Sequence, residues 1–141
     1  MSITATSNPR GVPVPINAFT DRSVYLAMVH QGISGQLVRS TVAAYDCREL
    51  LTRVLNVSTS NLSRVYARKR LAVNQSEAVL DTLRVLEKSD QTFEDQAIAT
   101  QWLRTPVSAL GGVAPNELLD TFEGRKMVTE VLNKIAYGDF S

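Results

Sequence analysis

Apolar residues recur three or four positions apart in short runs along the chain, and each run is bounded by residues that begin or end helices. The final run is the clearest, because Gly138 follows its apolar face at a position typical of a helix end. That face consists of Met127, Val128, Val131, Leu132 and Ile135. No segment shows the sustained alternation of apolar and polar residues that a strand requires. The spacing therefore predicts an all-α fold.

The spacing and the capping residues together place the helices. The expected helices cover residues 22–29, 34–45, 47–55, 59–67, 75–87, 95–103, 115–119 and 123–136. Asp21, Asp46 and Ser58 are residue types that cap helix N-termini, and each stands directly before an expected helix. Asn74 and Glu77 have the spacing of a capping box at the start of the fifth helix.

The expected organisation has three parts. Residues 1–19 contain three prolines and little to bury, which predicts a flexible N-terminal arm. Residues 20–90 and residues 91–141 form two helical regions. Apolar residues make up 44% of the chain and charged residues 21%, values ordinary for a globular protein.

Nothing in the sequence points to secretion or to a membrane. Cys47 is the single cysteine and cannot form an internal disulfide. The first residues lack an apolar stretch of signal-peptide length, and the longest unbroken apolar run is Val24–Val29, far short of a membrane span. We therefore expect a cytoplasmic protein with no membrane partner.

The net charge of +1 conceals a segregation of charge. Residues 48–70 carry a net charge of +5, residues 71–141 carry −5, and residues 1–47 carry +1. A basic middle and an acidic C-terminal half favour two partners of different character. The alternative is a merely uneven surface charge.

The basic middle has the pattern of a helix-turn-helix. Asn56 and Val57 make a tight turn between two short helices, and apolar residues of both helices can hold them together. The second helix leaves side chains exposed that can bond bases or phosphates. The candidate DNA-binding residues are Thr59, Ser60, Asn61, Arg64, Arg68, Lys69 and Arg70. The alternative is an ordinary helical hairpin with a solvated face.

Residues that could perform catalysis are not grouped in the sequence. His30 has no neighbouring residue at metal-ligand spacing, and Cys47 has no evident histidine partner. Gly111-Gly112 lacks the lysine and the strand context of a phosphate-binding loop. We expect a protein that is not an enzyme and has no metal or cofactor.

The C-terminal region carries an ordered series of motifs. The series runs Trp102-Leu103-Arg104-Thr105-Pro106, Ala109-Leu110-Gly111-Gly112, Ala114-Pro115-Asn116-Glu117-Leu118-Leu119-Asp120-Thr121, Glu123-Gly124 and Tyr137-Gly138. It resembles the toxin-binding domain of the Xre/MbcA/ParS antitoxin family, and the resemblance extends over about residues 48–141. Two differences stand out: Glu94 follows Phe93 where family members commonly have glycine, and no glycine precedes Val57.

The resemblance implies a type II toxin–antitoxin system. The fold would be all-α, with an Xre-like helix-turn-helix in residues 20–90 and a small toxin-binding domain in residues 91–141. The implied partners are operator DNA, a second copy of the chain in a homodimer, and a RES-domain toxin, which resembles ADP-ribosyltransferases and consumes NAD. The toxin-binding residues implied are Asp120, Glu123, Arg125, Lys134, Tyr137, Gly138, Asp139, Phe140 and Ser141. The alternative function is a dimeric transcriptional regulator with no toxin partner.

Overall fold

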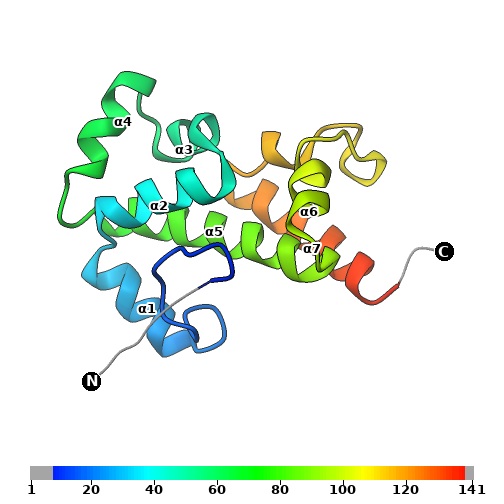
Figure 1. Cartoon of the computed structure of the whole chain (residues 1–141), viewed down its shortest axis with the longest axis horizontal. Helices are drawn as coiled ribbons and strands as arrows, with labels where there is room; N and C mark the ends of the chain where they lie inside the picture. The colour runs from blue at the N-terminus through cyan, green and yellow to red at the C-terminus, as the bar shows by residue number, and fades with distance from the viewer. Residues whose placement is uncertain (1–7, 139–141) are drawn as a thin grey trace. The chain divides into compact units, whose positions relative to one another are not determined.

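The computed structural model describes residues 8–138, and the regular structure within them is helical. The elements are α1 (Arg22–Gln31), α2 (Gly35–Tyr45), α3 (Arg48–Leu55), α4 (Thr59–Tyr66), α5 (Val73–Phe93), α6 (Gln96–Leu103), the 3-10 helices η1 (Ser108–Leu110) and η2 (Pro115–Glu117), and α7 (Phe122–Ala136) (Figure 1). The only pairing of the strand type among the described residues is one antiparallel bridge between Val107 and Val113. The all-α prediction is confirmed.

The starts of α1 and α4 follow the expected capping residues, whereas the start of α3 does not. The carboxylate of Asp21 accepts from the backbone N–H groups of Ser23 and Val24, and the Ser58 hydroxyl accepts from that of Asn61. The prediction for Asp46 is wrong. Asp46 has a left-handed backbone with φ of 49° and ends α2, while Cys47 stands at the N-cap of α3 without a side-chain bond.

Helix α5 is longer than the expected helix at both ends. It begins at Val73, before the expected capping box, and the Asn74 side chain accepts only from its neighbour Gln75. The predicted capping box is therefore wrong. At the other end the helix continues past Glu87 because Ser89 and Asp90 extend its buried face. The Ser89 hydroxyl satisfies its hydrogen-bonding need inside the helix by donating to the Leu86 carbonyl at 2.6 Å.

The chain divides into two compact units, and the division falls within α5. Unit 1 covers residues 1–80 and unit 2 covers residues 81–141. Within the described residues, no helix has both the length and the apolar character needed to cross a membrane.

The N-terminal stretch of unit 1 packs on the unit instead of extending from it. Val12, Val14 and Ala18 are buried, so the expectation of little to bury is wrong for residues 8–19. Asn8 donates a side-chain hydrogen bond to the Tyr45 hydroxyl at 2.9 Å, and the Arg10 guanidinium lies 4.4 Å from the centre of the Tyr45 ring. Figure 1 shows this stretch, in dark blue, beside α2. Residues 1–7 of the predicted arm lie outside the described residues.

The rest of unit 1 is built around α2, which contacts both α3 and α4. Gly35, the first residue of α2, donates its backbone N–H to the Arg68 carbonyl at 2.8 Å. Next to it, the Leu71 N–H donates to the Ile33 carbonyl, and the Ile33 N–H donates to the Ser76 hydroxyl at 3.0 Å. These bonds hold the start of α2 against the segment that follows α4.

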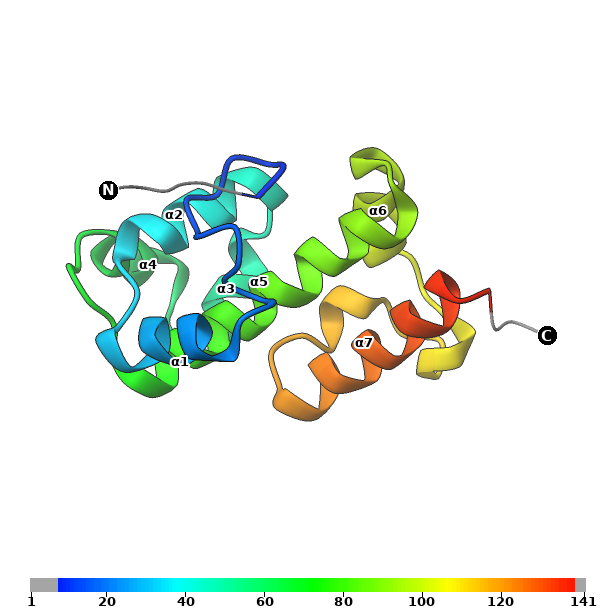
Figure 2. The same cartoon turned by 90° about the horizontal axis from the view of Figure 1, so that it is seen from below.

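Unit 2 contains α6, both 3-10 helices, α7 and the C-terminal part of α5 (Figure 2). Its interior includes Leu86 of α5 together with Val128 and Leu132 of α7. Phe93 and Trp102 contact each other with ring centres 5.4 Å apart, which holds the end of α6 near the end of α5.

Glu94 has a left-handed backbone with φ of 56°, directly after the last residue of α5. We expect Glu94→Gly to raise the free energy of unfolding by about 0.5–1 kcal/mol, since the left-handed penalty of ~1–2 kcal/mol exceeds the entropic cost of glycine. Urea denaturation measures the change. Glu94→Ala is the control because alanine keeps the penalty. An equal gain from both variants would contradict the backbone explanation.

Candidate functional site

The turn between α3 and α4 places two short helices close together. Asn56 ends α3 with φ of 55°, and the Val57 N–H donates to the Thr52 carbonyl at 3.0 Å. Asparagine is one of the few residues other than glycine that adopts this conformation readily. Asn56 therefore provides the backbone geometry for which the sequence lacks a glycine.

Apolar residues on the facing sides hold α3 and α4 together. Leu51 and Leu55 of α3 and Leu62 and Val65 of α4 are buried. The opposite side of α4 is solvent-exposed and carries the predicted base-reading residues. These exposed residues are Thr59, Ser60, Asn61 and Arg64.

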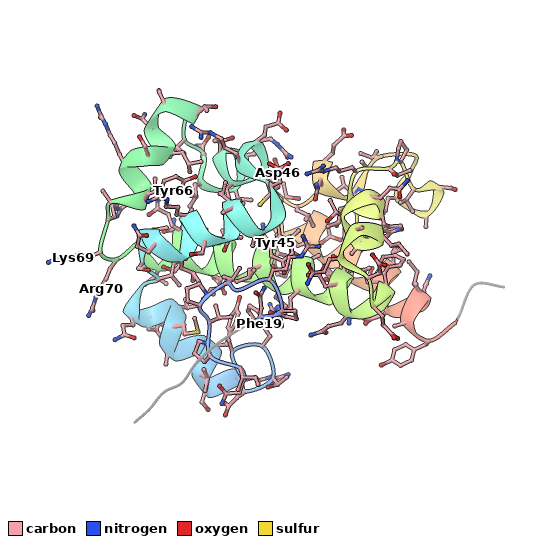
Figure 3. The ribbon with its side chains drawn as sticks, in the orientation of Figure 1. Phe19, Tyr45, Asp46, Tyr66, Lys69 and Arg70 are labelled. Carbon is pink, nitrogen blue, oxygen red and sulfur yellow. The ribbon has the colours of Figure 1, made fainter. Side chains whose placement is uncertain are left out.

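Three further cations follow α4 in the segment that leads to α5. Arg68, Lys69 and Arg70 are all exposed. The Arg68 guanidinium donates to the Gln75 side-chain oxygen at 3.2 Å, whereas Figure 3 shows Lys69 and Arg70 extending away from the ribbon. The structure thus brings all the predicted DNA-binding residues onto α4 and the segment after it.

The two units carry opposite charge. Residues 1–80 hold nine basic and four acidic residues, a net charge of +5. Residues 81–141 hold six basic and ten acidic residues, a net charge of −4. The segregation seen in the sequence therefore follows the division into units.

The predicted toxin-binding residues of unit 2 lie in different environments. Glu123, Lys134 and Gly138 are exposed, Tyr137 is 83% exposed, and Asp120 is half-buried. The remaining predicted residues, Asp139, Phe140 and Ser141, lie outside the described residues.

Arg125 differs from the other predicted toxin-binding residues because it is buried. Its Nε donates to Oδ2 of Asp81 on α5 at 2.7 Å, and its Nη1 donates to the Leu119 carbonyl at 3.0 Å. Only 9% of its side chain is exposed. The expectation that Arg125 presents its charge to a partner is corrected: the guanidinium joins α5, α7 and the segment before α7 inside unit 2.

Phe122 is an exposed aromatic residue that the sequence analysis missed. It is the first residue of α7 and is 68% exposed, next to Glu123. A helical projection provides the signal, because Phe122 lies away from the face that buries Val128 and Leu132. Phe122 and Tyr137 are thus exposed aromatic residues at the two ends of one helix.

Most of unit 2 matches a known family of protein domains. Residues 89–138 match the family described as the antitoxin Xre/MbcA/ParS C-terminal toxin-binding domain. The Prs ADP-ribosylating antitoxin of Sphingobium sp. (strain YBL2) is 29% identical over 127 residues, covering 82% of this chain and 80% of the relative.

Two further relatives match shorter parts of the chain. The antitoxin Xre of Photorhabdus laumondii subsp. laumondii is 27% identical over 90 residues, covering 62% of this chain and 61% of that protein. The antitoxin Xre of Yersinia enterocolitica serotype O:8 is 30% identical over 73 residues, covering 51% of this chain and 49% of its own length.

The class of protein follows from the fold and these matches: an all-helical antitoxin, a binding protein and not an enzyme, as the sequence predicted. More narrowly, residues 89–138 match the C-terminal toxin-binding domain of the Xre/MbcA/ParS antitoxins, and most of the chain is similar to a protein named as an antitoxin.

Proposed function

We propose that this antitoxin neutralises a RES-domain toxin, an NAD-consuming enzyme resembling ADP-ribosyltransferases, by covering the toxin's active-site entrance with its C-terminal region. We further propose that a homodimer represses its own operon through α3 and α4. The observation that carries the proposal is the match of residues 89–138 to a toxin-binding domain, because this range includes all of α7 and the residues on both sides of it.

The toxin-binding surface we propose lies along α7. Tyr137 and Phe122 are exposed aromatic residues, the type that most often contributes binding energy at protein interfaces. They are fifteen residues apart, about 22 Å at the rise of an α-helix. Asp120, Glu123 and Lys134 are the other members of the proposed surface among the described residues. Asp139, Phe140 and Ser141, which follow in the sequence, are also proposed as members.

The DNA-binding surface we propose is the exposed side of α4. A helix of this kind enters the major groove, where arginine can pair with guanine and asparagine with adenine. Arg64 and Asn61 are both exposed on this side of α4. The net charge of +5 on unit 1 favours binding to a polyanion such as DNA. A homodimer would present two such helices to two half-sites.

The positive unit 1 also favours a second candidate, a dimeric transcriptional regulator with no toxin partner. The two candidates share the DNA-binding surface and differ in the role of α7. Variants that affect the two surfaces separately distinguish them.

We expect Arg64→Ala and Tyr137→Ala to impair different functions. Arg64→Ala should weaken binding to a duplex from upstream of the gene by about tenfold or more, since a lost base contact costs ~1–3 kcal/mol, and should leave toxin neutralisation intact. Tyr137→Ala, or deletion of residues 137–141, should weaken neutralisation and leave DNA binding intact. Fluorescence anisotropy measures the first function and growth on toxin co-expression the second.

Matched controls are available on the same units. Arg22 is an exposed cation of α1, and Ile98 is an exposed apolar residue of α6. Arg22→Ala and Ile98→Ala should behave as wild type in both assays. Equal loss of both functions in either test variant would contradict separate surfaces.

A further inference from the structure

Two arginines from other helices lie near the side chain of Tyr66, in the last turn of α4. Tyr66 is half-buried, and Figure 3 shows it between α4 and α2. Burial has the largest effect on the pKa of its hydroxyl and raises it. Arg48 of α3 and Arg39 of α2 lower this pKa, the Cys47 thiol raises it, and the net change is upward. Both guanidinium groups are thus close enough to act on the hydroxyl, which stays protonated at neutral pH and can donate a hydrogen bond.

The positions of these groups relative to α4 follow from helical geometry. Thr59, Ser63 and Tyr66 are spaced by four and three residues, so they form one edge of the exposed side. Asn61 and Arg64 are three residues apart and lie along the other edge, and the cations at 68–70 follow them in the chain.

Arg48 and Arg39 belong to the Tyr66 edge. The Arg48 Nη2 donates to the Thr59 carbonyl at 3.4 Å, which places this guanidinium beside the start of α4. Arg39 is exposed on α2, the helix that contacts α4. No carboxylate pairs with Arg39 among residues 8–138, so its charge remains available to a ligand.

We propose that Arg39, Arg48 and the Tyr66 hydroxyl form a second phosphate-binding flank of α4, opposite the flank made by the cations at 68–70. The inference rests on the proposed DNA-binding function. The major groove is about 12 Å wide, and a helix inside it has a phosphate backbone on each side. A reading helix bracketed by cations on both edges matches that arrangement, whereas the sequence indicated cations on one edge only.

The test measures DNA affinity against salt concentration for the full chain. The probes are a duplex from upstream of the gene and a random-sequence duplex of equal length. Arg39→Ala should lower the slope of log K against log salt by ~0.9, the effect of losing one phosphate contact, and weaken binding to both duplexes by about tenfold. Arg22→Ala, which removes an equal charge from α1, should change neither quantity.

Tyr66→Phe provides an independent measurement, because it removes only the hydroxyl. A neutral donor displaces no counterion, so affinity should fall by roughly fivefold at an unchanged salt slope. Thermal unfolding of each variant verifies that the fold is retained. If the wild type binds and both variants keep its affinity and slope, the second flank is overturned while DNA binding stands. Failure of the wild type to bind either duplex would overturn the DNA-binding function together with the flank.

Discussion

Replacing Gly35 by alanine is expected to lower the free energy of unfolding by about 3 kcal/mol or more. A Cβ atom on Gly35 would lie 2.1 Å from the Val65 carbonyl oxygen and 2.5 Å from that of Tyr66. Overpacking a well-filled interior costs ~1–3 kcal/mol when side chains can shift, and here the obstacle is the backbone of α4. The loss is a large share of the 5–15 kcal/mol typical of a whole domain.

The expected loss of stability in Gly35→Ala comes from close packing against α4, and not from the exchange of glycine for alanine in general. Gly111 is the control because a Cβ there would meet nothing within 4 Å, although its φ is +78°. Gly111→Ala should therefore cost only about 0.5–1 kcal/mol, the left-handed penalty of ~1–2 kcal/mol less the entropic cost that removing glycine saves. Urea denaturation followed by circular dichroism compares the two variants. A Gly35→Ala protein as stable as Gly111→Ala would show that α2 does not approach α4 as closely as described.

Replacing Asp81 by alanine is expected to destabilise unit 2 by about 3–5 kcal/mol, because it leaves the Arg125 guanidinium buried without its carboxylate. The two side chains are only 13% and 9% exposed, so water cannot readily replace the lost partner. Asp81 also pairs with Arg84 one turn along α5, but that side chain is 45% exposed and contributes much less.

A double variant isolates the cost of the unpaired charge. Asp81→Ala combined with Arg125→Met removes both charges and should recover much of the lost stability, as apolar replacements of buried ion pairs often do. The same double variant should still neutralise the toxin, because Arg125 lies inside the unit. Denaturation and the co-expression growth assay measure the two effects. If the double variant were no more stable than Asp81→Ala, the buried pair would not explain the loss.

Local sequence signals predicted the helices well, because they depend on neighbouring residues. The cap at Ser58 and the glycine after α7 correspond to observed helix ends. Asp46 was mispredicted because it can either cap a helix or end one in the left-handed conformation, and the approach of α3 decides between them. Glu94 and Asn56 stand where the family pattern has glycine, and both have a left-handed backbone. The sequence shows only that glycine is missing at these two positions.

Features that depend on contacts between distant residues could not be predicted from the sequence. Arginine is usually a surface residue, and Arg125 is buried because it pairs with Asp81, forty-four positions earlier in the chain. Val12 and Val14 stand among prolines, and their burial depends on Tyr45 and its helix. The three members of the second flank, Arg39, Arg48 and Tyr66, come from three different helices, so no run of sequence contains the flank.

The most direct test is co-expression of the chain with the product of the neighbouring gene, followed by co-purification and measurement of cellular NAD. A RES-domain toxin expressed alone should deplete NAD, and the antitoxin should form a stable complex with it and restore the NAD level. Tyr137→Ala should restore less NAD than wild type at equal expression. A stable complex that leaves the toxin's NAD consumption unchanged, or no complex at all, would contradict neutralisation by active-site covering.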